Sequence, residues 1–294
     1  MAYEFDFQRY VDRKKTPGGG QEARGGFGDY AFSADLLVLR RLERLAPVRV
    51  VVETTVRLWK NFQKNELLGT AVRVSSRQFP HLHAKVVECA EILDIPTPTV
   101  YVTESPHVNA GTYGTNTEAF IMVNSALVDK MSDEEVMFAI GHECGHIQNN
   151  HVVYHTAANF LARGLGVYVK WASLPASMAL DAWSRRGEVT CDRAGLICCR
   201  NEEVALKSIM KLALGSEKLF EEMNLDEFME QLEGVQEGWG RLSELFRSHP
   251  YLPKRVKAVK AFAESAYYRN LLGEKGGRPL DEIDREVEEI IQVL

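Results

Sequence analysis

The segment His142-Glu143-Cys144-Gly145-His146 holds two histidines four residues apart, with a glutamate directly after the first. On a helix, side chains four residues apart lie on one face, so both imidazoles can bind the same metal ion. Glu143 projects about 100° away from His142, beside the metal, where a general base can take a proton from water. The spacing predicts a hydrolytic zinc site; the alternative is a histidine pair on a surface helix.

A catalytic zinc site needs a third protein ligand and an open position for water. The metzincin pattern would place a glycine and a histidine where this chain has Asn149 and Val152, so that pattern is excluded. His151 lies five residues after His146, which is about 140° around an unbroken helix and outside the same site. We therefore expect His151 to have a hydrogen-bonding structural role.

Glu188 and Asp192 are a downstream acidic pair that is also spaced by four residues. If their segment is helical, Glu188 can bind the metal while Asp192 accepts the second ring N–H of a ligand histidine. On spacing alone, a solvated helix face with ion pairs to Arg185 and Arg193 explains the same residues. The upstream HExxH segment favours the ligand interpretation.

The elements that position these residues follow one another as in an α+β chain, without alternating strand–helix units. Ser132 and Glu135 form a capping-box pattern at the start of a helix predicted to run through His151. Apolar and β-branched runs predict strands at 70–75, 100–103 and 119–124, with an edge strand or loop at 109–117. Helices are predicted from 33, from 47 to about 65, and over 80–93, 183–200, 202–213, 225–246, 253–272 and 281–293.

Composition and charge describe a globular chain. The 294 residues are 45% hydrophobic and 26% charged, which excludes a wholly disordered protein. The formal net charge of −6 argues against a broad phosphate-binding surface, so we expect no nucleic-acid partner. Six glycines in 16–30 predict a flexible N-terminal segment over 1–30, followed by a single domain over 31–294.

The cysteines and the apolar segments bear on location. Five cysteines without zinc-ribbon spacing argue against a disulfide framework, and the N-terminus has no apolar signal-peptide core. We therefore expect a cytoplasmic protein. The run Gly164–Leu180 is interrupted by Lys170 and Pro175, which favours a buried helical hairpin over a membrane span; peripheral membrane contact is the alternative.

The run from Val74 to His151 resembles the soluble peptidase domain of the HtpX and CAAX-prenyl-endopeptidase family of zinc peptidases, which are gluzincins. The matching pieces follow the family's order over roughly residues 70–260. They are RVSSRQFP, PTVYVTES, VNAGTYGTNTEAFIMVNSALVDKMSDEEVMFAIGHECGHIQNNH, SRRGEVTCDRAG and SHPYLPKR. The resemblance implies a mostly helical zincin-type domain with a small mixed β-sheet and HExxH on the active-site helix.

The resemblance also implies a role for each residue of the predicted metal site. The implied ligands of one zinc ion are His142, His146 and Glu188. Glu143 would be the general base, and Asp192 matches the family's second acidic residue. Cys191 stands where an alanine is usual, a departure that leaves the ligands untouched.

Two further elements match the family outside the metal ligands. Asn109 and Ala110 match an Asn-Ala pair that lines the substrate cleft in gluzincins. His249 and Arg255 lie in a His-Pro…Arg element. The resemblance implies that His249 stabilises the oxyanion, and we expect Arg255 to lie around the metal with Asp192.

The motif and the resemblance together predict a zinc endopeptidase that hydrolyses peptides or unfolded proteins. An extended substrate would pair its backbone with the edge strand after Asn109. Two alternatives stay open. One is a peptide-binding or chaperone-like zinc module with little proteolysis, and the other is a quality-control peptidase at a membrane surface, with 164–180 as the contact.

Overall fold

The computed structural model describes residues 28–58, 69–115, 118–164, 167–225, 227–230 and 251–292. Of the segment predicted to be flexible, residues 1–30, the first 27 residues lie outside the described part of the chain. Most of the predicted helix 225–246 lies outside them as well. Gly28 and Tyr30 are described and are buried.

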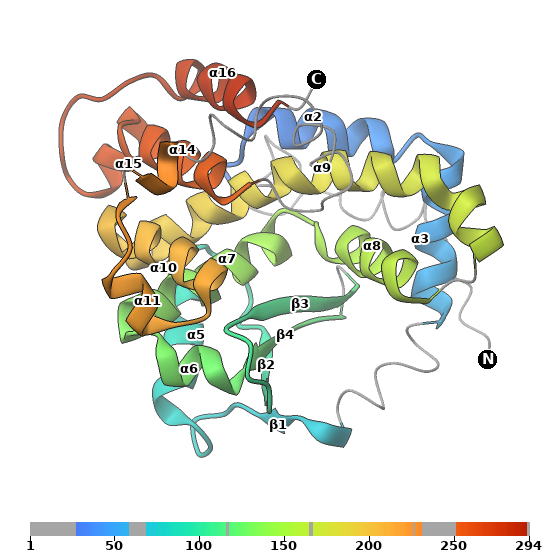
Figure 1. Ribbon diagram of the computed structural model, residues 1–294, viewed down its shortest axis with the longest axis horizontal. Helices are drawn as coiled ribbons and strands as arrows, with labels where there is room; N and C mark the ends of the chain where they lie inside the picture. The colour runs from blue at the N-terminus through green and yellow to red at the C-terminus, as the bar shows by residue number, and fades with distance from the viewer. Residues whose placement is uncertain are drawn as a thin grey trace.

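The described residues are mostly helical, with one small sheet, as predicted (Figure 1). The strands are β1 (Val72–Arg73), β2 (Thr99–Thr103), β3 (Ala110–Thr115) and β4 (Glu118–Asn124). The helices up to the middle of the chain are α2 (Ser33–Leu42), α3 (Ala46–Leu58), α5 (Pro80–Ile92), α6 (Ser125–Lys130), α7 (Asp133–Gln148) and α8 (Val152–Gly164). Those that follow are α9 (Val167–Cys199), α10 (Glu202–Leu214), α11 (Glu217–Glu221), α14 (Leu252–Ala263), α15 (Ala266–Leu271) and α16 (Leu280–Ile291).

The sheet is mixed, with the strand order β1-β2-β4-β3. β2 and β4 are parallel, while β1 and β3 pair antiparallel with their neighbours. Side chains of β4 alternate between the two faces: Ile121 and Val123 join the main core, and Phe120 and Met122 form a small cluster of their own. β3 lies at one end of the strand order and is an edge strand, which was one of the two predictions for residues 109–117, an edge strand or a loop.

Helix α7 lies between the sheet and helix α9 (Figure 1). Its N-terminus has the predicted capping box, in which Ser132 and Glu135 each bond the other's backbone N–H. Nearly all of its later side chains are buried, because an enclosed helix has no face left for solvent. The HExxH segment thus stands on a helix that is held from both sides.

Glycines let α7 and α9 approach closely. A Cβ added to Gly145 would lie 2.8 Å from the Cβ of Ala194 and 3.2 Å from the Cα of Cys191. Cys191 and Ala194 lie about one turn apart on α9, which also carries Glu188. The short approach brings the two halves of the candidate site together.

We expect Gly145→Ala to lower the free energy of unfolding by about 1–3 kcal/mol, the usual cost of overpacking a close contact. Urea unfolding followed by circular dichroism measures it. Gly69→Ala is the control, since nothing lies within 4 Å of a Cβ at that position. Equal stability of both variants would show that α7 and α9 tolerate a wider separation.

The helix predicted to run through His151 is interrupted before it. α7 ends at Gln148, Asn150 takes a left-handed conformation with φ of 62°, and α8 begins at Val152. Asparagine tolerates this conformation better than most residues. The prediction of an unbroken helix was wrong, and the break changes the direction in which His151 points.

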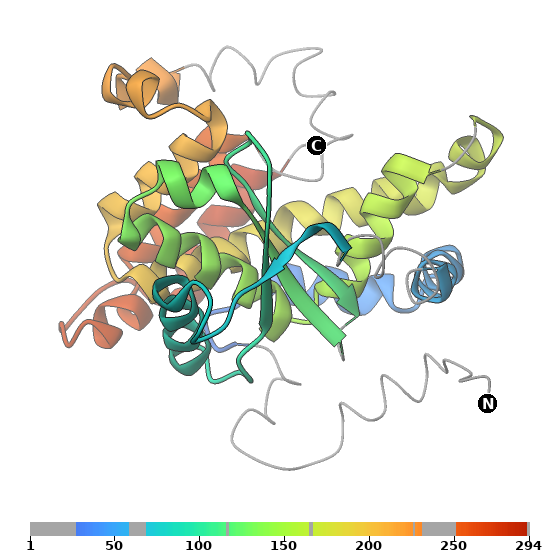
Figure 2. The ribbon, with the colours of Figure 1, turned by 90° about the horizontal axis from the view of Figure 1, so that it is seen from below.

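Helix α9 begins earlier than the predicted start at residue 183 and includes 167–180. α8 and the first part of α9 run side by side as a helical hairpin (Figure 2), but α9 continues through Pro175, so the predicted interruption there was wrong. Among the described residues, no helix combines the length with the apolar character that crossing a membrane requires.

The C-terminal helices are fixed to α9 by buried ion pairs. Arg193 pairs with Asp284 of α16 at 2.7 Å, and its guanidinium lies over the rings of Phe32 and Phe262. The predicted helix 253–272 is divided into α14 and α15, because the Ser265 hydroxyl caps a new helix. Arg255, in the first turn of α14, contacts Asp192 of α9.

Candidate metal centre

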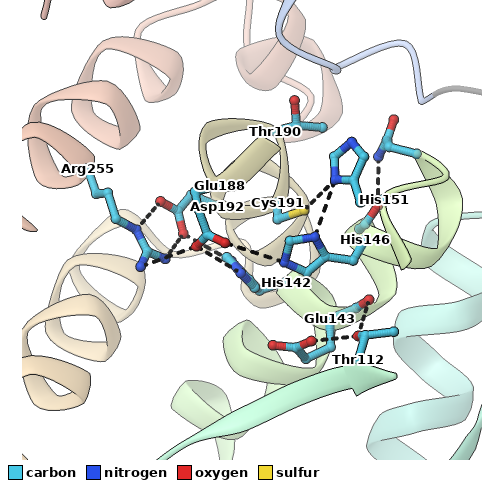
Figure 3. A network of polar contacts seen from close by, with 12 residues as sticks. Thr112, His142, Glu143, His146, His151, Glu188, Thr190, Cys191, Asp192 and Arg255 are labelled. Carbon is cyan, nitrogen blue, oxygen red and sulfur yellow. Dashed lines mark hydrogen bonds and ion pairs between the residues drawn. The ribbon is translucent and has the colours of Figure 1, made fainter. Parts of the chain in front are cut away.

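His142 and His146 of α7 meet Glu188 of α9 in the interior of the protein (Figure 3). Nε2 of His142 lies 3.5 Å from Oε2 of Glu188, and Nε2 of His146 lies 3.7 Å from Oε1. The exposed fractions are 9% for His142, 6% for His146 and 1% for Glu188. Each histidine thus faces one oxygen of Glu188, and the sulfur of Cys191 is a further ligand atom within 4.8 Å of the two histidines' nitrogens.

The spacing of these atoms fits a shared metal ion better than hydrogen bonds. Ligand atoms at the zinc-bond length of about 2.0–2.1 Å in tetrahedral geometry are roughly 3.3–3.4 Å apart. Both nitrogen–oxygen distances lie just beyond that value and beyond an ordinary hydrogen bond. Two imidazoles and one carboxylate also form a known catalytic zinc set. The residues therefore fit the ion that the sequence predicts.

Asp192 and Arg255 lie behind His142. Oδ1 of Asp192 is 3.1 Å from Nδ1 of His142, and Nε and Nη2 of Arg255 donate to the two oxygens of Asp192 at 2.8 and 2.6 Å. Burial raises the pKa of Asp192, but the charge and hydrogen bonds of Arg255 outweigh it and hold the pKa below its ordinary value. The carboxylate therefore stays ionised beside the ring.

The two histidines differ in how readily they hold a proton. Burial lowers the pKa of His142, but the hydrogen bond that its ring donates to Asp192 and the charge of Glu188 outweigh burial and raise it. Burial and the nearby rings of His155 and His142 take the pKa of His146 well below its ordinary value. His146 is therefore neutral, and a metal at His142 competes with a proton.

The side chain of Glu143 points away from Glu188 and toward the sheet, as expected for the residue after His142 (Figure 3). The Thr112 hydroxyl of β3 lies 2.5 Å from Oε2 of Glu143 and 3.2 Å from its backbone carbonyl oxygen. The shorter contact holds the carboxylate. Sequence reasoning missed Thr112, although strand alternation puts it on the same face as Ala110, two residues earlier.

His151 returns to the site from beyond the helix break. Its Nδ1 lies 3.3 Å from Nδ1 of His146 and 3.6 Å from Sγ of Cys191. The predicted structural, hydrogen-bonding role of His151 agrees with this contact. His155, one turn further on, places its ring centroid 4.4 Å from that of His146, a neighbour that sequence reasoning did not assign.

The predicted substrate-binding pair, Asn109 and Ala110, lies at the start of the edge strand β3. Ala110 begins β3 and Asn109 is exposed just before it, with its carbonyl oxygen accepting from the backbone N–H of Asn124. The strand that carries Thr112 thus connects this pair to Glu143. His249 lies outside the described residues.

The comparisons with known proteins agree on one family. Residues 76–263 match peptidase family M48. The chain is 34% identical over 221 residues to the plastoglobule-localized metallopeptidase 48 of Arabidopsis thaliana, a match that covers 70% of this chain and 64% of that relative. It is 26% identical over 239 residues to an HtpX homolog protease of Streptococcus gordonii, covering 68% of this chain and 80% of the relative.

The chain thus spans just under two thirds of the Arabidopsis relative's length. The matched region contains α7, α9 and most of the sheet, and with them the HExxH segment, Glu188 and Asp192. The resemblance seen in the sequence is confirmed: this chain belongs to peptidase family M48.

Proposed function

We propose that this chain is a zinc-dependent endopeptidase in which His142, His146 and Glu188 bind the metal and Glu143 is the general base. The single observation that carries the proposal is the convergence of both Nε2 atoms on the two oxygens of one buried carboxylate. Membership of a peptidase family supports the reaction class. When bound, zinc would polarise the scissile carbonyl and activate water for attack.

The protein's own groups would handle the proton. Thr112 holds Oε2 of Glu143, so we propose Oε1 as the atom that accepts a proton from the attacking water and gives it to the leaving amine. Asp192, fixed by Arg255, would keep the ring of His142 in the orientation and tautomer that a ligand needs.

The edge of β3 that faces away from β4 is the proposed place for an extended substrate. The hydroxyl of Thr156 in α8 accepts from the N–H of Gly114 at 3.3 Å and lies 3.1 Å from its carbonyl oxygen, so the backbone of Gly114 faces away from β4. By strand alternation, Ala110 and Thr112 turn their backbone groups the same way. A peptide could pair there, beside Glu143, and Thr156 would end the paired stretch.

The cytoplasm is the proposed location. All five cysteines are free, and four of them are buried, which fits a reducing compartment.

Asp192→Asn is expected to retain the metal with an affinity about 10–100-fold lower. It should also lower kcat, because an amide is a poorer acceptor for the His142 N–H. Metal content after dialysis and peptide turnover measure the two effects. Asp284→Asn is the matched control, since it neutralises the carboxylate that pairs with Arg193, another buried arginine. The control should lose stability only; equal metal loss in both variants would reduce Asp192 to an ion-pair partner.

His249→Phe is expected to lower kcat by about a hundredfold or more with little change in KM. A donor directed at the developing oxyanion acts in the transition state rather than on bound substrate. Steady-state kinetics on one quenched fluorescent peptide separates the two parameters. An increase in KM alone would make His249 a substrate-binding residue.

The test of the proposed function is incubation of the purified protein with a proteome-derived peptide library, read by mass spectrometry. We expect new internal cleavage sites that disappear with a zinc chelator and return with added zinc. The Glu143→Gln protein is the matched control and should produce them at least about 10²-fold more slowly. Bound but uncleaved peptides under all metal conditions would favour the peptide-binding or chaperone-like alternative.

A further inference from the structure

Behind His146, buried polar side chains connect α7 to the beginning of α2. Nδ1 of His146 contacts Nδ1 of His151 at 3.3 Å, and Nε2 of His151 lies 3.0 Å from Oδ2 of Asp35. His151 and Asp35 have no exposed surface. Asp35 lies outside the residues that match the family, so this carboxylate reaches the site from a different part of the chain.

The contact between the two Nδ1 atoms determines which ring donates. Nε2 of His146 faces Glu188, so its neutral ring carries the proton on Nδ1 when Nε2 binds metal. Nδ1 of His151 must then accept, which leaves the proton of that ring on Nε2. This atom lies 3.0 Å from Oδ2 of Asp35, without hydrogen-bond alignment, and the negative charge there favours an N–H over a lone pair.

Asp35 is held firmly in this position. The indole N–H of Trp183 donates to Oδ1 at 2.8 Å, and the Thr190 hydroxyl donates to Oδ2 at 2.6 Å. Thr190 in turn accepts from the backbone N–H of Phe32 at 3.2 Å. Within the described part of the chain, no lysine or arginine forms an ion pair with Asp35.

A buried carboxylate is costly unless hydrogen-bond donors or nearby positive charge stabilise it, and besides the Trp183 and Thr190 donors the charge of Arg193 acts on Asp35. Two imidazoles in series lead from Asp35 to the metal-facing Nε2 of His146. On the other side of the site, Asp192 supports His142 in the same way through one contact. Each histidine of the HExxH segment therefore has a buried carboxylate behind it, direct for one ring and relayed for the other.

We infer that Asp35 and His151 are positioning residues for the metal ligand His146, and that they hold its ring orientation and its tautomer. The inference rests on the proposed role of His146 as a ligand. Partners of this kind typically change metal affinity by about 10–100-fold. Asp35 acts only through His151, so the effects of removing them should not add.

The test measures the zinc affinity of the full chain by competition with a chelating dye, in variants that circular dichroism shows to be folded. Asp35→Asn and His151→Phe should each weaken zinc by about 10–100-fold. The double variant should bind no more weakly than His151→Phe alone. Thr190→Val is the control: it removes one donor to Asp35, leaves the His151 contact, and should change affinity less.

Two results would overturn the inference: unchanged affinity in Asp35→Asn, or an equal further loss when Asp35→Asn is added to His151→Phe. The second is what a packing role for Asp35 alone would give. A measurement on the zinc-loaded wild type needs no variant to fold. Nitrogen-15 shifts of the histidine rings should show His151 protonated at Nε2 and not at Nδ1, and the reverse tautomer would contradict the inference.

The inference and the proposed function fail differently. A wild-type chain that binds no zinc would overturn the proposed function and the inference with it. Tight zinc binding by the wild type that is lost in His146→Ala but kept in Asp35→Asn would leave the proposed function standing and remove only the role of Asp35.

Discussion

Replacing Glu143 with glutamine is expected to lower kcat for peptide hydrolysis by about 10²–10⁴-fold while zinc content stays at the wild-type level. Glutamine keeps the shape of the side chain and can still contact Thr112, but it cannot accept a proton at neutral pH. Glu143 points toward β3 and away from the point where Glu188 meets the histidines (Figure 3). The substitution therefore removes the base and leaves the proposed ligands in place.

The measurement is single-peptide turnover together with metal content after dialysis. Thr112→Val is the matched control, because it removes one hydrogen bond to the carboxylate and keeps the carboxylate itself. A hydrogen bond of about 1 kcal/mol corresponds to roughly a fivefold change in rate, much less than loss of the base. Turnover near the wild-type rate in Glu143→Gln would exclude Glu143 as base, and loss of zinc would show that it supports the metal.

Local spacing predicted which side chains share a helix face, but only the HExxH segment and the family resemblance indicated that the two faces meet. His142 and His146 are four residues apart, as are Glu188 and Asp192, and the helical repeat places the members of each pair on one face. The structure shows these pairs on facing helices. Their convergence depends on close packing of α7 against α9, which the glycine at 145 permits. The sequence showed that glycine within the motif but did not indicate its contact.

Interactions between distant segments could not be predicted in this way. Asp35 precedes His151 by more than a hundred residues, and its sequence context, the first turn of a helix after Ser33, is that of an ordinary N-terminal acidic residue. The position of His151 was missed for a local reason. A single left-handed residue, Asn150, turns the chain between two helices, and periodicity assumes that no such break exists.

Replacing Glu188 with alanine is expected to weaken zinc binding by more than the roughly 10–100-fold typical of groups that only support a ligand. Zinc sites of this type use three protein ligands, and the variant would keep only His142 and His146. Hydrolysis should fall with the metal. Zinc content after dialysis, measured by mass spectrometry, and dye competition for affinity test this without relying on activity.

Two controls separate a lost ligand from a disturbed core. Glu135→Gln also neutralises a buried glutamate, which pairs with Lys211 at 2.8 Å at the start of α7, and it should lower stability without removing zinc. Cys191→Ala tests the other candidate, since its sulfur lies with the His142 and His146 nitrogens within 4.8 Å. Zinc retained in Glu188→Ala but lost in Cys191→Ala would make the thiolate the third ligand. The opposite result is expected, because the two oxygens of Glu188 each face one histidine nitrogen, whereas the sulfur of Cys191 contacts His151.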